Sequence, residues 1–378
     1  MKKVMFMTNS LSGGGAEKIL QTLINNLDRK KYDITLYSLH YEPDCLSLYP
    51  SDINYKYVFG FKKTSFLIDC LKSFLNKVKG KIFMTLPPFL FYFLYIKGKY
   101  DVEIAFIEGE STKIISGSNN RHSKKYAWVH IDLINNPWTD IAYKSLEEEK
   151  KCYRKYNRVL CVSSSVKNAF DSKYNTGNSA IQYNPVDEKE ILNKSKELIV
   201  HKQANLQFVT LGRLVPQKGY DRLLKCIKKI RDNGFDNFNI WILGEGEQRT
   251  LLEKYIEDNS LKKYVTLLGF KSNPYPYIAE SDAFICSSRS EGFSTVATES
   301  LILGKPIFTV DCAGMKELFG GYKCGIIVNN SEDDLYKMLL SILNNNHKIS
   351  QYNFDIANRQ KSFTLERRIM EIEDLINE

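Results

Sequence analysis

The chain has 378 residues, of which 43% are hydrophobic, 12% aromatic and 26% charged. This composition can build hydrophobic cores, so it excludes an intrinsically disordered chain, and the length favours two domains. The net charge of +9 is uneven: residues 1–185 carry 27 Lys and Arg against 17 Asp and Glu, whereas residues 186–378 carry 26 against 27. The N-terminal half should therefore face an anionic partner, such as phosphate, nucleic acid or a membrane surface.

Short apolar runs alternate with amphipathic segments along the N-terminal half. Residues 2–9 predict a buried strand, residues 15–27 a helix with one apolar face, and residues 33–39 a second strand. We expect four further strands, at residues 101–107, 125–131, 158–164 and 179–185. Strand–helix alternation of this kind predicts a mostly parallel sheet with helices on both faces.

The longest apolar run covers residues 82–96. It is shorter than the roughly 20 residues that span a bilayer, and Pro87-Pro88 interrupts it. Lysines flank it in the sequence at positions 77, 79, 81, 97 and 99. Two interpretations remain open: a buried helix of the N-terminal domain, or a patch in the membrane interface with its lysines on anionic headgroups.

After residue 185 a polar stretch ends and the alternation starts again. We expect strands at residues 206–212, 238–244, 264–269, 283–288, 306–310 and 325–328, and helices at residues 219–230, 251–261 and from 296 onward. The fold class is therefore α/β, with two Rossmann-like, doubly wound parallel-sheet domains, residues 1–185 and 186–361, facing a central cleft. Residues 362–378 have helical apolar spacing, and this helix either caps its own domain or crosses back to the N-terminal one.

The eight cysteines form no C-x-x-C pair and no Cys/His cluster at zinc spacing, and several lie in apolar runs, where a free thiol packs as a small hydrophobe. No signal peptide precedes the first strand, so we expect a cytoplasmic protein. The sequence also has no D-x-D triplet that would hold a metal–nucleotide pair. We therefore expect no metal site and no cofactor.

Three glycines, Gly13, Gly14 and Gly15, follow the first strand and open the first helix. Without side chains, their N–H groups can approach an anion at a helix N-terminus. The pattern is neither a dinucleotide fingerprint nor a P-loop, so a plain strand-to-helix turn is the alternative.

A second motif, G-R-L-V-P-Q-K-G, places Arg213 and Lys218 on a loop after the first strand of the second half. A forked guanidinium and a compact ammonium on one loop suit a diphosphate. We therefore prefer a phosphate-binding loop to a solvated loop with incidental charges.

A third motif runs from Glu291 to Glu299, with Phe293, Ser294 and Thr295 between them. Glu291 should precede a helix and Glu299 should lie about two turns inside it, so loop N–H groups could bind phosphate oxygens while the carboxylates accept hydroxyl hydrogen bonds. Paired carboxylates also occur in glycoside hydrolases. The neighbouring cationic loop favours a phosphate-bearing donor instead.

Together, G-G-G-A-E-K, G-R-L-V-P-Q-K-G, E-G-F-x(6)-E and D-C-A-G-M-K-E-L resemble the retaining GT-B glycosyltransferases of family 4, whose members include enzymes of bacterial capsule, O-antigen and other surface polysaccharides. The resemblance implies that Arg213 and Lys218 bind the donor diphosphate, that Glu299 binds the ribose and that Glu291 contacts the transferred sugar. It further implies donor-site positions at Gly244, Glu245, Gly269 and Phe270, and a histidine near the donor sugar, His130. Ser294 departs from the glycine of many relatives.

The resemblance implies a metal-independent transfer of a hexose or N-acetylhexosamine from a nucleotide sugar, a UDP-sugar by preference, to a glycan or lipid-linked glycan. The basic N-terminal half would then meet an anionic membrane, as a peripheral protein on the inner face of the cell membrane. Two alternatives remain: a non-catalytic subunit that binds nucleotide sugar or glycan, and a basic nucleic-acid-binding protein. No nucleic-acid-binding module is evident, so no nucleic-acid partner is expected.

Overall fold

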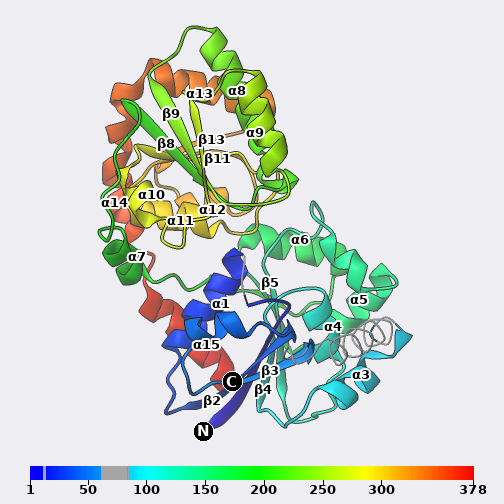
Figure 1. Cartoon of the computed structure of the whole chain (residues 1–378). Coiled ribbons are helices and arrows are strands. Elements are labelled where there is room, and N and C mark those ends of the chain that lie inside the picture. Colours follow the sequence, from blue (N-terminus) through cyan, green and yellow to red (C-terminus); the bar gives the residue numbers. More distant parts are fainter. Residues whose placement is uncertain (12–13, 61–82, 84) are drawn as a thin grey trace, which may run out of the picture. The chain divides into compact units, whose positions relative to one another are not determined.

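The computed structural model describes residues 1–11, 14–60, 83 and 85–378 (Figure 1). The chain divides into two compact units. One comprises Met1–Pro185 together with Glu366–Glu378, and the other comprises Val186–Leu365.

The N-terminal unit contains a seven-stranded sheet in the order β3-β2-β1-β4-β5-β6-β7, and each neighbouring pair is parallel. Its strands are β1 (Lys2–Thr8), β2 (Tyr32–His40), β3 (Asn54–Phe59), β4 (Val102–Ala105), β5 (Lys124–Val129), β6 (Arg158–Cys161) and β7 (Ser179–Ile181). Val4, Met5, Phe6 and Met7 of β1 are all fully buried, which shows that both faces of the sheet are covered.

The helices of this unit are α1 (Gly15–Asn26), α3 (Pro88–Tyr95), α4 (Glu110–Ser116), α5 (Leu146–Tyr153) and α6 (Ser164–Tyr174), with two 3₁₀ turns, η1 (Pro43–Leu48) and η2 (Trp138–Ala142). The last helix, α15 (Leu365–Asn377), buries Ile369, Ile372, Leu375 and Ile376. The Lys2 ammonium donates to the carbonyl of Ile376 at 2.7 Å, and the Tyr126 hydroxyl donates to that of Leu375 at 2.9 Å. The end of the chain thus packs on the N-terminal unit.

The C-terminal unit contains a six-stranded parallel sheet in the order β10-β9-β8-β11-β12-β13. Its strands are β8 (Leu206–Leu211), β9 (Phe238–Leu243), β10 (Val265–Gly269), β11 (Ala283–Cys286), β12 (Ile307–Val310) and β13 (Gly325–Val328). Its helices are α7 (Glu188–Lys194), α8 (Tyr220–Asp232), α9 (Arg249–Asp258), α10 (Tyr275–Glu280), α11 (Thr295–Ile302), α12 (Met315–Phe319), α13 (Glu332–Asn344) and α14 (Asn353–Gln360), with the 3₁₀ turns η3 (Pro216–Lys218) and η4 (Asn346–Tyr352).

Alternate side chains of these strands enter two separate hydrophobic cores. Phe208 and Ile240 pack with residues of α8, α9 and α13, whereas Val209 and Trp241 pack with residues of α10, α11 and α12. This two-residue period is the pattern of a strand buried on both faces, and it gives the C-terminal unit three layers.

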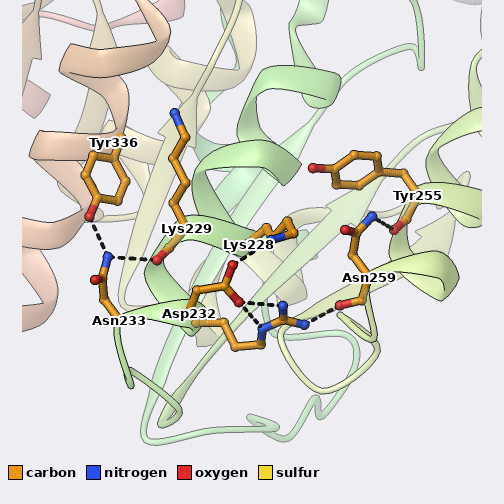
Figure 2. A network of polar contacts seen from close by, with 8 residues as sticks. Lys228, Lys229, Asp232, Asn233, Tyr255, Asn259 and Tyr336 are labelled. Carbon is orange, nitrogen blue, oxygen red and sulfur yellow. Dashed lines mark hydrogen bonds and ion pairs between the residues drawn. The ribbon is translucent and has the colours of Figure 1, made fainter.

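Helix α8 is fixed at its C-terminal end by polar contacts with its neighbours (Figure 2). The amide of Asn233 donates to the Tyr336 hydroxyl of α13 at 2.7 Å and to the Lys229 carbonyl at 2.9 Å. The Lys228 ammonium pairs with Asp232 at 2.6 Å. Of these contacts, the hydrogen bond from Asn233 to Tyr336 joins the end of α8 to α13, whereas the other two are local to the end of α8.

The expected α/β class with two doubly wound parallel sheets is confirmed. Strand β3 was not expected, because its sequence, NYKYVF, places a lysine among aromatic residues and lacks a long apolar run. The seven cysteines in the described part of the chain are all free and six of them are buried, in agreement with their interpretation as small hydrophobes.

Of the apolar run, the structure describes residues 83 and 85–96, and these are partly buried. Phe83, Phe91, Tyr92 and Ile96 are buried, whereas one face of α3 is exposed. The lysines at positions 77, 79 and 81 lie outside the described residues. Within the described ranges, every helix is too short or too polar to cross a bilayer.

Candidate active site

In the sheet of the C-terminal unit the strand order reverses between β8 and β11. These two strands are neighbours in the sheet although β9 and β10 lie between them in the sequence. Ligands of doubly wound sheets bind at such a point, outside the carboxyl ends of the strands, because successive crossovers leave to opposite sides there. The loop of Arg213 and Lys218 follows β8, and the loop that contains Glu291 follows β11. Two predicted motifs therefore meet at the switch point.

Lys218 and Glu291 form an ion pair between these loops. The Lys218 ammonium lies 2.7 Å from Oε1 of Glu291, which also accepts a 2.6 Å hydrogen bond from the Ser288 hydroxyl. Both side chains are largely buried, with 21% of Lys218 and 10% of Glu291 exposed. Burial alone would lower the pKa of Lys218, but the Glu291 carboxylate outweighs it and the pKa is raised, so the ammonium stays charged.

The two loops are also joined through their backbones. The Ser287 hydroxyl donates to the Lys218 carbonyl at 2.9 Å, and the Arg222 guanidinium donates to the Ser287 carbonyl at 2.9 and 2.6 Å. Gly219 has φ +67°, and a Cβ there would collide with the Ser287 carbonyl oxygen. The close approach of the loops thus requires glycine at position 219.

Arg213 is the exposed cation of the same loop. Within the described ranges its guanidinium forms no hydrogen bond or ion pair, whereas the next residue, Leu214, is buried and anchors the loop. A fixed backbone with an exposed guanidinium is suited to bind a phosphate-bearing ligand.

Helix α11 begins at Thr295, after Ser294, whose hydroxyl accepts a hydrogen bond from the Ala297 amide at 3.3 Å. Glu299 is the fifth residue of α11, so it lies one turn inside the helix and not two, as expected from the sequence. Its Oε1 accepts a 3.3 Å hydrogen bond from the Tyr275 hydroxyl. Burial raises the pKa of Tyr275, which keeps this phenol protonated as a donor.

The remaining donor-site candidates of this unit follow β9, β10 and β11 at the same sheet edge. A Cβ on Gly244 would collide with the Gly212 carbonyl, so the loops after β8 and β9 touch there. Glu245 is paired with Arg249, Gly269 adjoins Glu245, and Phe270 is 73% exposed. Phe293 is half-buried and packs beside Gly314.

The N-terminal unit has its own switch point, between β1 and β4. Gly14 caps α1 and Gly15 is its first residue, while Gly13 lies outside the described residues. The Asn9 amide donates to Glu110 at 2.9 Å and accepts from the Ser111 hydroxyl at 2.6 Å. The side chain of Glu17 lies beside Gly14. The carboxylates at this corner favour ligand hydroxyl groups over phosphate.

His130 follows β5 with its ring held against the backbone. Its Nε2 lies 2.8 Å from the Phe106 carbonyl, which can only accept, so Nε2 carries the proton. Burial lowers the pKa of His130 to about 4, so the imidazole is neutral at physiological pH. Asp132, the weaker neighbouring candidate, accepts hydrogen bonds from its own loop, at the amides of Ile134 and Asn135.

Glu108, which lies next to His130, was not expected from the sequence. One carboxylate oxygen accepts from the His130 amide at 3.2 Å and the other from the Trp138 indole at 3.3 Å. Burial raises the pKa of Glu108 to about 7. Its position in the sequence could have indicated it. Glu108 lies in the loop after the buried strand β4, and such loops form the binding edge of a parallel sheet. In the described part of the chain, no three His, Cys, Asp or Glu residues cluster as a metal site would require.

Comparison with known proteins relates the chain to glycosyltransferases. Residues 193–361 match the family model described as "Glycosyl transferases group 1". The chain is 26% identical over 394 aligned positions, 96% of each protein, to the N-acetylgalactosamine-N,N'-diacetylbacillosaminyl-diphospho-undecaprenol 4-alpha-N-acetylgalactosaminyltransferase of Campylobacter jejuni. It is 30% identical over 227 residues to an uncharacterized glycosyltransferase of Methanocaldococcus jannaschii, and this match spans 59% of the chain and 60% of that relative.

Among solved structures, HepE of Anabaena in complex with UDP and glucose superposes with a TM-score of 0.75, at 17% identity and over the full length of both chains. The two parallel sheets and this likeness show the GT-B fold. With the family model and the relatives, they support a GT-B glycosyltransferase. Other relatives are an amylovoran biosynthesis glycosyltransferase of Erwinia amylovora and a lipopolysaccharide core biosynthesis glycosyltransferase of Rhizobium meliloti.

Proposed function

We propose that the protein transfers a hexose or N-acetylhexosamine from a UDP-sugar to a glycan or lipid-linked glycan during synthesis of a bacterial surface polysaccharide. The observation that carries the proposal is the arrangement at the switch point of the C-terminal unit. There the ammonium of Lys218 is held between two loops, the exposed guanidinium of Arg213 lies on one of them, and Glu299 lies buried behind the N-terminus of α11.

In this proposal, Arg213 and Lys218 bind the donor diphosphate and stabilise the charge that develops as it leaves. The N-terminal amides of α11 add to that field, because the positive end of the helix dipole lies there. The Glu299 carboxylate accepts hydrogen bonds from ribose hydroxyls, and Glu291 accepts them from the transferred sugar. Arg213, Lys218 and the N-terminal amides of α11 together supply positive charge at the leaving group. We therefore propose that the reaction needs no divalent metal.

The transfer itself is proposed to retain the configuration at the anomeric carbon. The bond from that carbon to the diphosphate breaks as the acceptor oxygen bonds to the same face of an oxocarbenium-like sugar. The acceptor proton passes to the departing phosphate oxygen, so the products are the glycoside and the nucleoside diphosphate. This step requires no protein base. Glu291 positions the sugar through hydrogen bonds and forms no covalent bond to it.

The relatives support the substrate classes. The name of the Campylobacter relative specifies transfer of N-acetylgalactosamine to a diphospho-undecaprenol-linked sugar. The HepE structure holds UDP and glucose, and a TarM structure from S. aureus holds UDP with alpha-GlcNAc-glycerol. A lipid-linked acceptor would also account for the basic N-terminal half, and it would place the protein at the inner face of the cell membrane.

A thermal-shift panel tests the donor site first. The protein is heated with UDP, GDP and a set of UDP-sugars in the presence of EDTA, because a ligand that binds only the folded chain raises the melting temperature. We expect stabilisation by UDP and by one or two UDP-sugars, followed by turnover of those sugars with a lipid-linked acceptor. Stabilisation by UDP without turnover would identify a non-catalytic subunit, and no shift with any nucleotide would refute the proposal.

A further inference from the structure

Helix α3 presents four large apolar side chains to solvent. The exposed fractions are 54% for Phe89, 38% for Leu90, 61% for Phe93 and 48% for Leu94. Their spacing places all four within an arc of about 140° around the helix axis. We call this set of four side chains the α3 outer face. Exposed apolar side chains gathered on one face mark an interaction surface.

The opposite side of α3 is firmly packed. Phe91 and Tyr92 are 1% and 3% exposed, and the Tyr92 hydroxyl donates to the buried carboxylate of Glu103 at 2.7 Å. A Cβ on Gly117 would collide with the Pro88 carbonyl, so α4 ends directly against the start of α3. The α3 outer face is therefore displayed by an anchored helix and does not result from a loosely attached segment.

The surroundings of the α3 outer face are cationic. Residues 85–100 contain no Asp or Glu, and Lys97 and Lys99 follow the helix as exposed side chains. The Lys97 ammonium lies 5.9 Å from the centre of the Phe93 ring, so positive charge borders the apolar face directly. Asp101, the first acidic residue after α3, accepts a hydrogen bond from the Lys3 amide at 2.8 Å.

We propose that the α3 outer face docks on an anionic lipid bilayer. Its phenylalanines and leucines enter the boundary between headgroups and acyl chains, and Lys97 and Lys99 bind the headgroup phosphates. This deepens the proposed function and rests on its membrane location, but it concerns a surface apart from the donor site and can be tested without nucleotide or acceptor. It assigns the membrane contact to four apolar side chains of one helix and two lysines.

A bilayer fits this surface better than a second copy of the chain. A stable protein interface buries about 1,600 Å² in total, whereas one face of an eight-residue helix offers four side chains. A symmetric dimer through α3 would also bring the same lysines of both copies together without an acidic partner. An anionic bilayer accepts a small apolar face bordered by lysines without either difficulty.

The test is co-sedimentation of the full chain with vesicles of phosphatidylcholine alone and of phosphatidylcholine mixed with phosphatidylglycerol. We expect binding to the mixed vesicles, and a fall in the partition coefficient of about tenfold or more for the double variant Phe89→Ser/Phe93→Ser. Phe354→Ser is the matched control, because Phe354 is a 78% exposed phenylalanine of the other unit, and it should bind as the unchanged protein does.

A second variant tests the electrostatic part. Lys97→Gln/Lys99→Gln should weaken binding to the mixed vesicles by about fivefold for each lysine and leave binding to neutral vesicles unchanged. Failure of the protein to bind mixed vesicles, or equal binding by the serine variant, would overturn the proposal. So would a dimer in sedimentation velocity that the serine variant abolishes while vesicle binding persists. Because no nucleotide is present, these outcomes are independent of the thermal-shift result.

Discussion

The ammonium of Lys218 lies 2.7 Å from Oε1 of Glu291, so one ion pair joins the loops that follow β8 and β11. These strands are adjacent in the sheet, although 71 residues (212–282) separate the end of β8 from the start of β11, and the doubly wound topology brings them together. The ammonium has more than one proton to donate, so a bound diphosphate can be contacted without loss of Glu291. The pair therefore holds the lysine in place before a ligand arrives.

The first prediction concerns the two cations of this loop. Lys218→Ala and Arg213→Ala should each lower turnover by about 10²–10³-fold, because each removes positive charge at the leaving diphosphate. The Arg213 variant should unfold like the unchanged protein, since that side chain is exposed. The Lys218 variant should also lose stability, since Glu291 stays largely buried without its cation. Initial rates and urea unfolding measure the two effects.

Lys262→Ala is the control for both variants. Lys262 also forms an ion pair, with Glu257 at 2.8 Å, but its side chain is 74% exposed and lies on a different loop. Its removal should change neither turnover nor stability measurably. Near-normal turnover in the folded Arg213 and Lys218 variants would contradict their assignment to the donor site.

The second prediction uses two glycines with similar backbone angles, φ +67° at Gly219 and φ +75° at Gly177. Alanine at Gly177 meets nothing within 4 Å, so it should cost only the strain of the left-handed conformation, about 1–2 kcal/mol. Alanine at Gly219 would add a collision with the Ser287 carbonyl and push the loop of Lys218 away. Gly219→Ala should therefore lose more unfolding free energy than Gly177→Ala, and turnover as well. Equal losses would show that the loops can separate without consequence.

Much of the fold follows from local patterns in the sequence. The apolar runs of β1, β8 and β9 are long enough to be recognised individually, and the strand–helix alternation predicts parallel sheets. Strand β3 could not be predicted in this way, because polar and apolar residues do not alternate regularly in its sequence, NYKYVF, and four of the six are only half-buried. Its place at the sheet edge comes from pairing with β2, which is a tertiary interaction.

The candidate site was partly predictable for a related reason. Lys218 and Glu291 are recognisable because each lies in a motif at the end of a strand, but their contact depends on strand order, which no local pattern contains. Glu108 belongs to no motif, and its importance comes from burial and from its contacts with His130 and Trp138. The two faces of α3 were ambiguous because both are apolar, so periodicity could not distinguish buried from exposed residues.

The third prediction separates the two partners of the buried contact between α10 and α11, Tyr275 and Glu299. Glu299→Gln should weaken UDP binding by about 10–100-fold, because a carboxylate that accepts ribose hydrogen bonds is replaced by a neutral amide. Tyr275→Phe keeps the ring and removes the hydroxyl that donates to Glu299 at 3.3 Å, and it should reduce affinity far less. Titration of each variant with UDP measures both effects. An unchanged dissociation constant for Glu299→Gln would exclude Glu299 from the ribose site.

The fourth prediction concerns the pH dependence of stability. Burial raises the pKa of Glu108 from its ordinary value of 4.5 to about 7. The stability that Glu108 contributes is therefore fully present below pH 4.5 and is lost as the pH rises through about 7. Burial lowers the pKa of His130 from 6.5 to about 4, so its contribution is present above pH 6.5 and is lost as the pH falls through about 4. In the unchanged protein the two contributions oppose each other where their windows overlap, between pH 4.5 and 6.5.

Substituting one member of this pair should reveal the pH dependence that the other gives to the stability. Relative to the unchanged protein, Glu108→Gln should gain unfolding free energy as the pH rises from 4.5 to 7, by at most about 3 kcal/mol. His130→Gln should show the opposite trend. It should gain unfolding free energy as the pH falls from 6.5 to about 4. Each substitution also alters hydrogen bonds, but that cost is constant with pH and shifts the curve without changing its slope. Urea unfolding at steps of pH gives the slopes. Curves parallel to that of the unchanged protein would show that the pKa of neither group differs between the folded and the unfolded state.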